Sequence, residues 1–270
     1  MILKTFLGLF ALATSLAAHD FWLEPSSFRP AVDTRVDVQL VVGEHLVGEL
    51  VARKEKRILS FVAFDPAGRE EKVLGLDGKA PAGLWKARAP GLHVLGYQSV
   101  GTEIELEADK FERYLIEEGL ETVVADRKAR GESAAKGLEL YARCAKTFVV
   151  AQPLKGTASE PEIGWDRVLG YPLELVPTAN PCTLAPGADL TLRLLHRGAP
   201  LANALVGFMP KQDPTQEVRT RTDAEGRVTF TPKQGGVHLV RVVHMTRAAP
   251  DAAHHWESQW ASLTFEMPAR

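Results

Sequence analysis

The histidines are the residues of this chain with the clearest capacity for chemistry. His19 follows an apolar leader, and His244 lies near the end of an alternating apolar segment. If that segment forms a hairpin with residues 255–257, the facing side chains come within the ~5 Å of cross-strand neighbours. Imidazole nitrogens favour the later divalent transition metals. The sequence therefore predicts a metal site that draws on His19, Asp20, His244, His254, His255 and Glu257.

The role of His19 depends on how the leader is removed. Residues 1–18 combine one positive charge at Lys4 with an apolar core and small residues near position 18, the layout of a secretory signal peptide. Cleavage after Ala17 and cleavage after Ala18 both satisfy the small-residue rule. Only the second gives His19 a free amine beside its imidazole, which makes a chelating pair. We expect a periplasmic or secreted protein.

Composition narrows the class of partner. The 270 residues are 45% apolar and 24% charged, as in globular domains, and the net charge of −2 becomes −3 when Lys4 leaves with the leader. No basic block and no later apolar stretch of ~20 residues occurs. We therefore expect neither nucleic acid as a partner nor direct membrane insertion.

The two cysteines, Cys144 and Cys182, allow only one pairing. Export places them in an oxidising compartment, where a bond closing such a loop stabilises a fold by about 3 to 4 kcal/mol. We predict a disulfide. The alternative is two buried thiols.

Apolar alternation predicts that the site is carried by β-strands. Residues Val36, Val38, Leu40 and Val42 share one face of an alternating segment, and similar segments follow up to residue 107 and again from residue 172. Turn residues such as Asp223 and Gly226 separate them. The pattern favours a mainly β protein with two antiparallel Ig-like β-sandwich domains.

Within the first of these domains the period becomes helical, which predicts an insertion of about three helices. The three segments begin near Asp109, Glu121 and Ala134. The expected organisation is a signal peptide (1–18), a first sandwich (19–152) with the helical insertion (109–146), a linker (153–171) and a second sandwich (172–270).

Local enzyme motifs are absent. The chain has no Gly-rich phosphate loop, no Gly-x-Ser-x-Gly and no His-Glu-x-x-His. This favours binding over catalysis. Trp22, Trp256 and Trp260 leave open a surface that stacks on sugar rings, although a packed core edge is the simpler interpretation.

Several motifs resemble one bacterial envelope family, known as a domain of unknown function and grouped with periplasmic accessory components of nickel and cobalt uptake. They are His19-Asp20-Phe21-Trp22-Leu23-Glu24-Pro25, Val42-Gly43-Glu44, the segment 110–120, Tyr141 to Lys146, the Thr222 to Gly226 turn, Val243-His244-Met245 and the segment 256–265. The resemblance implies a metal ligand at His19 and another at His244.

Three hypotheses follow. The first is a periplasmic accessory protein, not an enzyme, that binds a divalent transition-metal ion as cargo, nickel or cobalt ahead of copper or zinc, and passes it to a membrane metal transporter. The second is a metal-free envelope module for carbohydrate binding or adhesion. The third is an oxidative enzyme with a copper histidine brace at His19.

Overall fold

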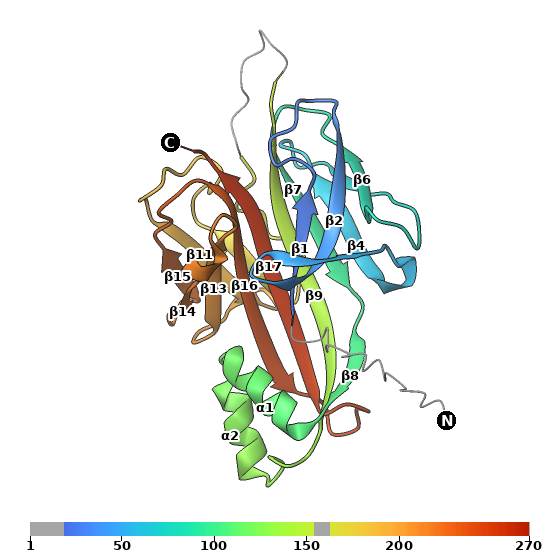
Figure 1. Cartoon of the computed structure of the whole chain (residues 1–270), viewed down its shortest axis with the longest axis vertical. Coiled ribbons are helices and arrows are strands. Elements are labelled where there is room, and N and C mark those ends of the chain that lie inside the picture. Colours follow the sequence, from blue (N-terminus) through green and yellow to red (C-terminus); the bar gives the residue numbers. More distant parts are fainter. Residues whose placement is uncertain (1–18, 154–162, 270) are drawn as a thin grey trace, which may run out of the picture.

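One long sheet runs through the molecule and organises the fold (Figure 1). The computed structural model describes residues 19–153 and 163–269. Within them, nine strands form this sheet in the order β14-β13-β16-β17-β9-β7-β4-β5, with β8 beside β9. Its strands are β4 (Ile58–Phe64), β5 (Glu70–Lys72), β7 (Gly91–Ser99), β8 (Thr102–Leu106), β9 (Gly137–Ala151), β13 (Leu205–Pro210), β14 (Val218–Arg221), β16 (Gly236–Arg247) and β17 (Trp256–Met267).

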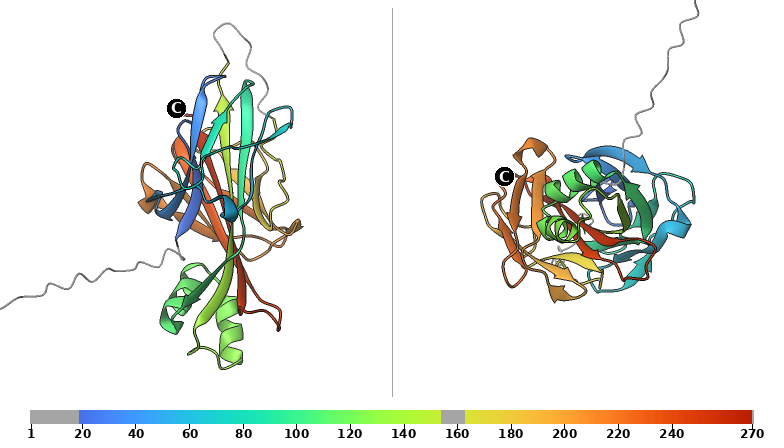
Figure 2. Two further views of the ribbon diagram at one scale, coloured as in Figure 1. Left: turned by 90° about the vertical axis from the view of Figure 1, so that its right-hand side faces the viewer. Right: turned by 90° about the horizontal axis from the view of Figure 1, so that it is seen from below.

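Two smaller sheets cover opposite faces of the long one. The N-terminal sheet holds β1 (Asp20–Pro25), β2 (Arg35–Glu44), β3 (Val47–Val51) and β6 (Gly83–Lys86). The C-terminal sheet holds β10 (Leu173–Pro177), β11 (Leu190–His196), β12 (Ala199–Pro200) and β15 (Arg227–Phe230). We call the half of the molecule with the N-terminal sheet the N-terminal lobe and the half with the C-terminal sheet the C-terminal lobe. Seen from below, the two lobes lie side by side (Figure 2). The expected mainly β architecture of antiparallel sandwiches is confirmed.

The two sandwiches share strand β9. It pairs in parallel with β17, whereas the other ladders between strands are antiparallel. Phe148 and Val150 pack in the core beneath the C-terminal sheet, and Val149 and Ala151 pack in the core beneath the N-terminal sheet. Alternate residues of one strand thus fill two cores. This accounts for the continuous apolar run at the end of β9, which is typical of strands buried on both faces.

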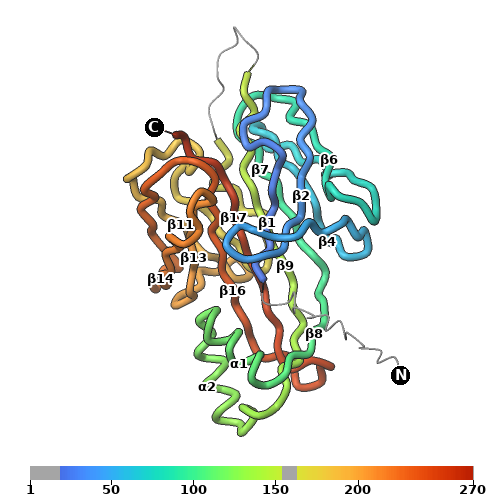
Figure 3. The backbone as a smooth tube through the Cα atoms, viewed as in Figure 1, coloured from blue at the N-terminus to red at the C-terminus, as the bar shows by residue number. Residues whose placement is uncertain are grey.

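Two helices, α1 (Ala108–Glu117) and α2 (Glu121–Ala129), lie at one end of the long sheet. Figure 3 shows β9, β16 and β17 extending beyond the sandwiches to reach them. Phe111, Tyr114 and Leu115 share a helix face and pack with Trp256 and Trp260. The Tyr114 and Trp260 rings stack with centroids 5.6 Å apart. The helices therefore cover an apolar end of the sheet.

The predicted third helix is wrong. Its residues from Gly137 onward form β9, which pairs with β7 and β8 on one side and with β17 on the other. Leu138, Tyr141 and Ala145 have helical spacing, but ladders on both sides of the strand outweigh a weak local preference. The insertion accordingly contains two helices.

The predicted disulfide is also wrong. Cys144 and Cys182 are both buried thiols, and neither forms a disulfide. Cys144 lies in the middle of β9, whereas the backbone N–H of Cys182 donates to Asn180 in the turn after β10. Both fill the core beneath the C-terminal sheet as small apolar residues. Burial raises the pKa of the Cys144 thiol to about 12.

Two other expectations concern the chain between and beyond the lobes. Residues 154–162 of the predicted linker and residues 1–18 of the predicted signal peptide lie outside the described residues. The described end of the linker is ordered by Glu174, whose carboxylate accepts hydrogen bonds from the N–H groups of Leu169, Gly170 and Tyr171. In the described part of the chain, no helix is both long and apolar enough to cross a bilayer.

Candidate functional site

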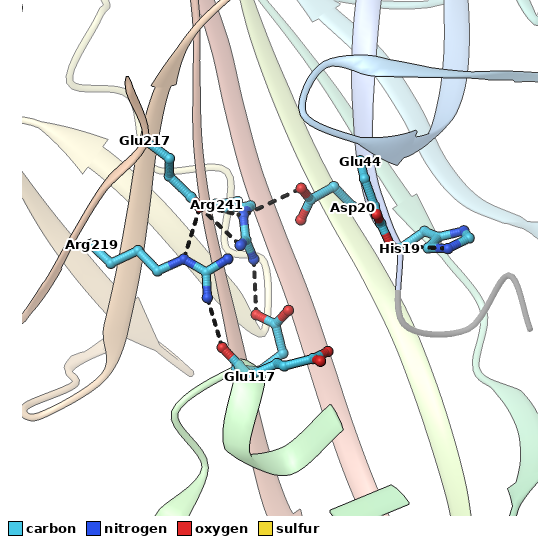
Figure 4. A network of polar contacts seen from close by, with 8 residues as sticks. His19, Asp20, Glu44, Glu117, Glu217, Arg219 and Arg241 are labelled. Atoms are coloured by element: carbon cyan, nitrogen blue, oxygen red, sulfur yellow. Dashed lines mark hydrogen bonds and ion pairs between the residues drawn. The ribbon is translucent and has the colours of Figure 1, made fainter. Parts of the chain in front are cut away.

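His19 lies just before β1, beside the end of β2. Its Nε2 atom is 3.2 Å from Oε1 of Glu44. Strand β1 pairs with β2 through Asp20 and Gly43, which brings the start of one strand to the end of the other. Figure 4 shows the His19 ring turned away from Arg241, while the Asp20 carboxylate is turned toward it. The first two predicted ligands thus point in different directions.

Arg241 on β16 holds three carboxylates from three different segments. Its guanidinium lies 3.3 Å from Asp20 of β1, 2.9 Å from Glu118 after α1, and 3.0 Å from Glu217 before β14. Arg219 extends the network through Glu217 at 2.9 Å and the carbonyl of Glu117 at 2.8 Å. Five guanidinium donors in a planar fork suit such multiple contacts. We name Arg241, Asp20, Glu118 and Glu217 the Arg241 cluster.

Burial dominates the electrostatics of the Arg241 cluster. Burial raises the pKa of Asp20 to about 7, although Arg241 opposes the shift, and it raises the pKa of Glu118 as well. Burial alone would lower the pKa of Arg241, but the surrounding carboxylates raise it above its ordinary value. Each charge in the cluster depends on the others. The cluster therefore fastens β1, α1 and β14 to β16.

A pocket of about 230 Å³ opens beside the Arg241 cluster. It is lined by Asp20, Glu44, His45, Glu117, Glu118, Met209, Glu217, Arg219 and Arg241. His45 and Leu46 form the two-residue turn between β2 and β3, with φ of 53° and 56°. Such turns usually carry Asn or Gly. Leu46 is buried against Trp22, Met209 and Leu239, and this anchors the turn at the pocket.

A pair of histidines occupies the other face of the long sheet. The ring of His244 on β16 lies 4.5 Å, centroid to centroid, from the ring of His196 at the end of β11. Side chains alternate along β16, so that Val240 and Val242 face the C-terminal sheet and Arg241 faces β1. His244 continues the face of Val240 and Val242. We name His196 and His244 the histidine pair.

Both imidazoles of the histidine pair are neutral near pH 7. Burial, helped by His196 and Arg197, lowers the pKa of His244 to about 4. Burial and Arg197 also lower the pKa of His196. A neutral imidazole carries one nitrogen with a free lone pair, which is the form that binds metals. The pair therefore offers two nitrogen ligands in contact.

Further polar groups lie on the same face near the histidine pair. Gln259 stands opposite His244 in the β16–β17 ladder, and its Oε1 atom is buried without a hydrogen-bond partner among the described residues. Nε2 of His254 is 3.4 Å from Oε1 of Glu257, and Oε2 of Glu257 is 4.0 Å from Nη2 of Arg197. These groups are candidates for completing a ligand set.

The structure thus divides the six predicted ligands. His244, His254 and Glu257 belong to the face of the histidine pair, while His19 and Asp20 lie on the opposite face. His255 is exposed in the turn before β17, where its N–H donates to the carbonyl of Leu138. Among residues 19–153 and 163–269, no three His, Cys, Asp or Glu side chains are already gathered with the spacing of a metal site.

Sequence reasoning missed two important residues, His196 and Arg241. His196 ends a strand whose partner on the other sheet lies far along the chain, and no local spacing relates it to His244. Arg241 stands in an apolar run between Val240 and Val242. A charged residue inside such a run was the available signal, because buried charges require partners.

The tryptophans proposed for sugar stacking are core residues. Trp22, Trp256 and Trp260 are 1%, 2% and 5% exposed. Trp256 and Trp260 pack beneath the helices, and Trp22 packs between β1 and β13. They present no open ring face to a ligand, which agrees with the simpler interpretation of their spacing.

Comparison with known proteins gives a matching family and likenesses to solved structures. The family model described as Domain of unknown function (DUF4198) matches residues 16–246. No curated protein sequence matches significantly. The solved structure of the D0-D1 domain of intimin matches with 14% identity over 91% of this chain and 97% of that one, with a TM-score of 0.20. No function is transferred from a likeness of that size.

Proposed function

The chain belongs to the DUF4198 family, and from the geometry of its histidine pair we propose that it is an exported protein that binds a divalent transition-metal ion as cargo. The observation that carries the proposal is the contact of two neutral imidazoles, 4.5 Å apart between ring centroids. The ion is nickel or cobalt ahead of copper or zinc, and the receiver is a membrane metal transporter.

The chemistry of the pair supports this cargo. Imidazole nitrogens are good ligands for nickel, copper and zinc, and they bind only when unprotonated. The lowered pKa values of His196 and His244 keep both rings in that form in a neutral periplasm. The neighbouring groups Gln259, His254 and Glu257 supply the candidates for a third ligand. A partly open site of this kind suits an ion that must later be released.

The proposal separates the cargo site from the N-terminus. His19 and Asp20 lie on the face of the Arg241 cluster, so one ion cannot join His19 to His244 through the intervening sheet. Asp20 is already held by Arg241 at 3.3 Å. His19 lies beside Glu44, on the opposite face of the sheet from the histidine pair. The prediction of a shared site between the first and last histidines is therefore not retained.

Metal titration tests this proposal. Chelator-treated protein is titrated with Ni(II), Co(II), Cu(II) and Zn(II) by isothermal calorimetry. We expect His244→Ala and His196→Ala each to lower the affinity at least about tenfold, about 1.4 kcal/mol, because each removes one nitrogen ligand.

The matched controls are His255→Ala, which removes an exposed histidine close to the cargo site, and His19→Ala, which removes the one on the opposite face. Both should bind as the wild type does. The proposal fails if no ion binds tighter than micromolar, or if His19→Ala is the variant that loses the metal. Circular dichroism of each variant verifies that the fold is intact.

A further inference from the structure

A separate pocket of about 160 Å³ lies at the far side of the N-terminal lobe. It is lined by Asp65, Arg69, Glu70, Glu71, Arg88 and His93. These residues come from the β4–β5 hairpin and from the start of β7 with the segment that precedes it. None of them belongs to the Arg241 cluster or to the histidine pair. We name this hollow the His93 pocket.

His93 carries an unused hydrogen-bond acceptor. The residue is 1% exposed, and its Nδ1 atom lies 3.2 Å from the carbonyl of Gly91. A carbonyl can only accept, so Nδ1 donates, and burial lowers the pKa of the ring, which keeps it neutral. Its Nε2 atom therefore bears a lone pair, and among the described residues this buried atom has no partner. An unpaired buried acceptor costs free energy that a ligand can recover.

The ring of His93 is held in place by its neighbours. Trp85 packs edge-on against it, with centroids 5.0 Å apart. The indole N–H of Trp85 donates to Oε1 of Glu71 at 2.5 Å, which fixes that carboxylate at the pocket wall. Asp65 is fixed on another side by the N–H and Nε of Arg69, each at 2.8 Å. Neutral acceptor and carboxylates are thus arranged before any ligand arrives.

The charges around the His93 pocket are of both signs. Asp65, Glu70 and Glu71 are acidic, and the negative charges of Asp65 and Glu71 act on the His93 ring. Arg88 is exposed and makes no side-chain hydrogen bond or ion pair with another described residue. One side of the pocket therefore suits a cation that donates hydrogen bonds. Arg88 suits an anion.

We propose that the His93 pocket binds a small free amino acid. Its ammonium group donates to Nε2 of His93 and lies against the carboxylates of Asp65 and Glu71, while its carboxylate pairs with Arg88. The volume is below the 300 to 1,000 Å³ typical of sites for drug-sized ligands, so the side chain of the ligand is short.

The groups at the pocket favour an ammonium over a metal ion. In the described part of the chain no three metal-binding side chains are gathered, so the pocket offers no ready set of metal ligands. An ammonium needs only hydrogen-bond acceptors at about 2.7 to 3.2 Å. The pocket lining supplies a neutral imidazole and carboxylates.

The test compares three probes that share parts of one ligand. L-alanine carries both charges, ethylammonium chloride carries the ammonium alone, and sodium acetate carries the carboxylate alone. By calorimetry on the full chain, we expect L-alanine to bind at least about tenfold tighter than either fragment. Arg88→Gln should reduce L-alanine to the affinity of ethylammonium. Arg113→Gln, an exposed arginine on α1, and His244→Ala should change nothing.

His93→Leu removes the acceptor but keeps a side chain that can pack on Trp85, and Trp fluorescence verifies that Trp85 remains packed. We expect this variant to weaken L-alanine and ethylammonium together and to leave acetate unchanged. The proposal is overturned if no probe binds at millimolar concentration, if acetate binds as tightly as L-alanine, or if Arg88→Gln has no effect. Binding of Zn(II) that depends on His93, without binding of L-alanine, would also overturn it. Failure here leaves the cargo proposal untouched, because that site uses other residues.

Discussion

Arg241 and His244 stand close together on β16, yet they face opposite sides of the sheet and illustrate two uses of a polar residue inside a sandwich. Arg241 is charged, and three carboxylates surround it. His244 is neutral, touches another neutral ring, and faces a Gln259 oxygen that has no partner in the described residues. A buried charge with all its partners in place holds elements together. Neutral groups with unused acceptors are the ones available to a ligand.

Replacement of Arg241 should have the largest effect. Arg241→Met leaves Asp20, Glu118 and Glu217 buried without their cation, and removal of one partner from a buried ion pair typically costs about 3 to 5 kcal/mol. We expect a loss of this size in the free energy of unfolding, measured by urea denaturation with circular dichroism.

The matched control is Arg113→Met, which breaks only an exposed ion pair with Asp109 on α1. It should change the free energy of unfolding by about 0.5 kcal/mol or less. A loss below about 1 kcal/mol in Arg241→Met would contradict the view that the Arg241 cluster is a structural fastening.

Replacement of Asp20 should have a smaller effect, which appears as a change in the pH dependence of the free energy of unfolding. The pKa of Asp20 is raised to about 7 in the folded protein, against an ordinary value of 3.8. Between these values the folded state holds a proton that the unfolded chain has released, so the contribution of Asp20 to stability is largest below pH 4 and falls as the pH rises toward 7. Asp20→Asn should remove this fall, on the order of 2 kcal/mol between pH 5 and 8.

The control for that slope is a buried carboxyl outside the Arg241 cluster. Burial also raises the pKa of Glu139 to about 7, beneath helix α1. Glu139→Gln should remove its own share of the slope, and the double variant should remove both. If Asp20→Asn retains the wild-type slope while Glu139→Gln flattens it, the proton is not held in the Arg241 cluster.

The smallest effect is expected on the other side of the comparison. His244→Phe replaces a neutral packed ring by an apolar ring of similar size, and volume-conserving exchanges usually cost less than about 1.5 kcal/mol. In metal-free protein we expect a change within that limit in the urea midpoint. Since His244 is proposed to bind cargo rather than to support the fold, a loss comparable with that of Arg241→Met would refute the contrast.

The comparison also explains how far the sequence could be interpreted. The alternation from Val36 to Val42 correctly predicted a strand with one buried face, since period-2 burial is a local property. The two helices after residue 107 were also predicted correctly, because the spacing of apolar residues along one helix face is likewise a local property. The helix predicted from residue 134 failed, because pairing of β9 with β17 depends on residues more than a hundred positions later. Local pattern cannot report that contact.

The candidate sites were harder to predict for a related reason. The hairpin of β16 and β17 brings His244 and Glu257 to one face, but His244 stands opposite Gln259 and not opposite residues 255–257 as predicted. His196 contacts His244 only because two sheets pack together. Asp20 forms an ion pair with Arg241 only because β1 packs against the long sheet. These contacts are set by tertiary packing. No local sequence motif can therefore predict them.

The parallel pairing of β9 with β17 also sets the order in which the chain can fold. Strand β9 ends at Ala151, but its partner β17 begins at Trp256, so one edge of β9 stays open until residues 256–267 have emerged. Pairings between distant segments form slowly, and an open strand edge is a template for aggregation. The synthesis of β17 thus decides when the open edge of β9 is covered. A chaperone that covers the open edge of β9 would increase the yield of folded protein more than one that binds the N-terminus.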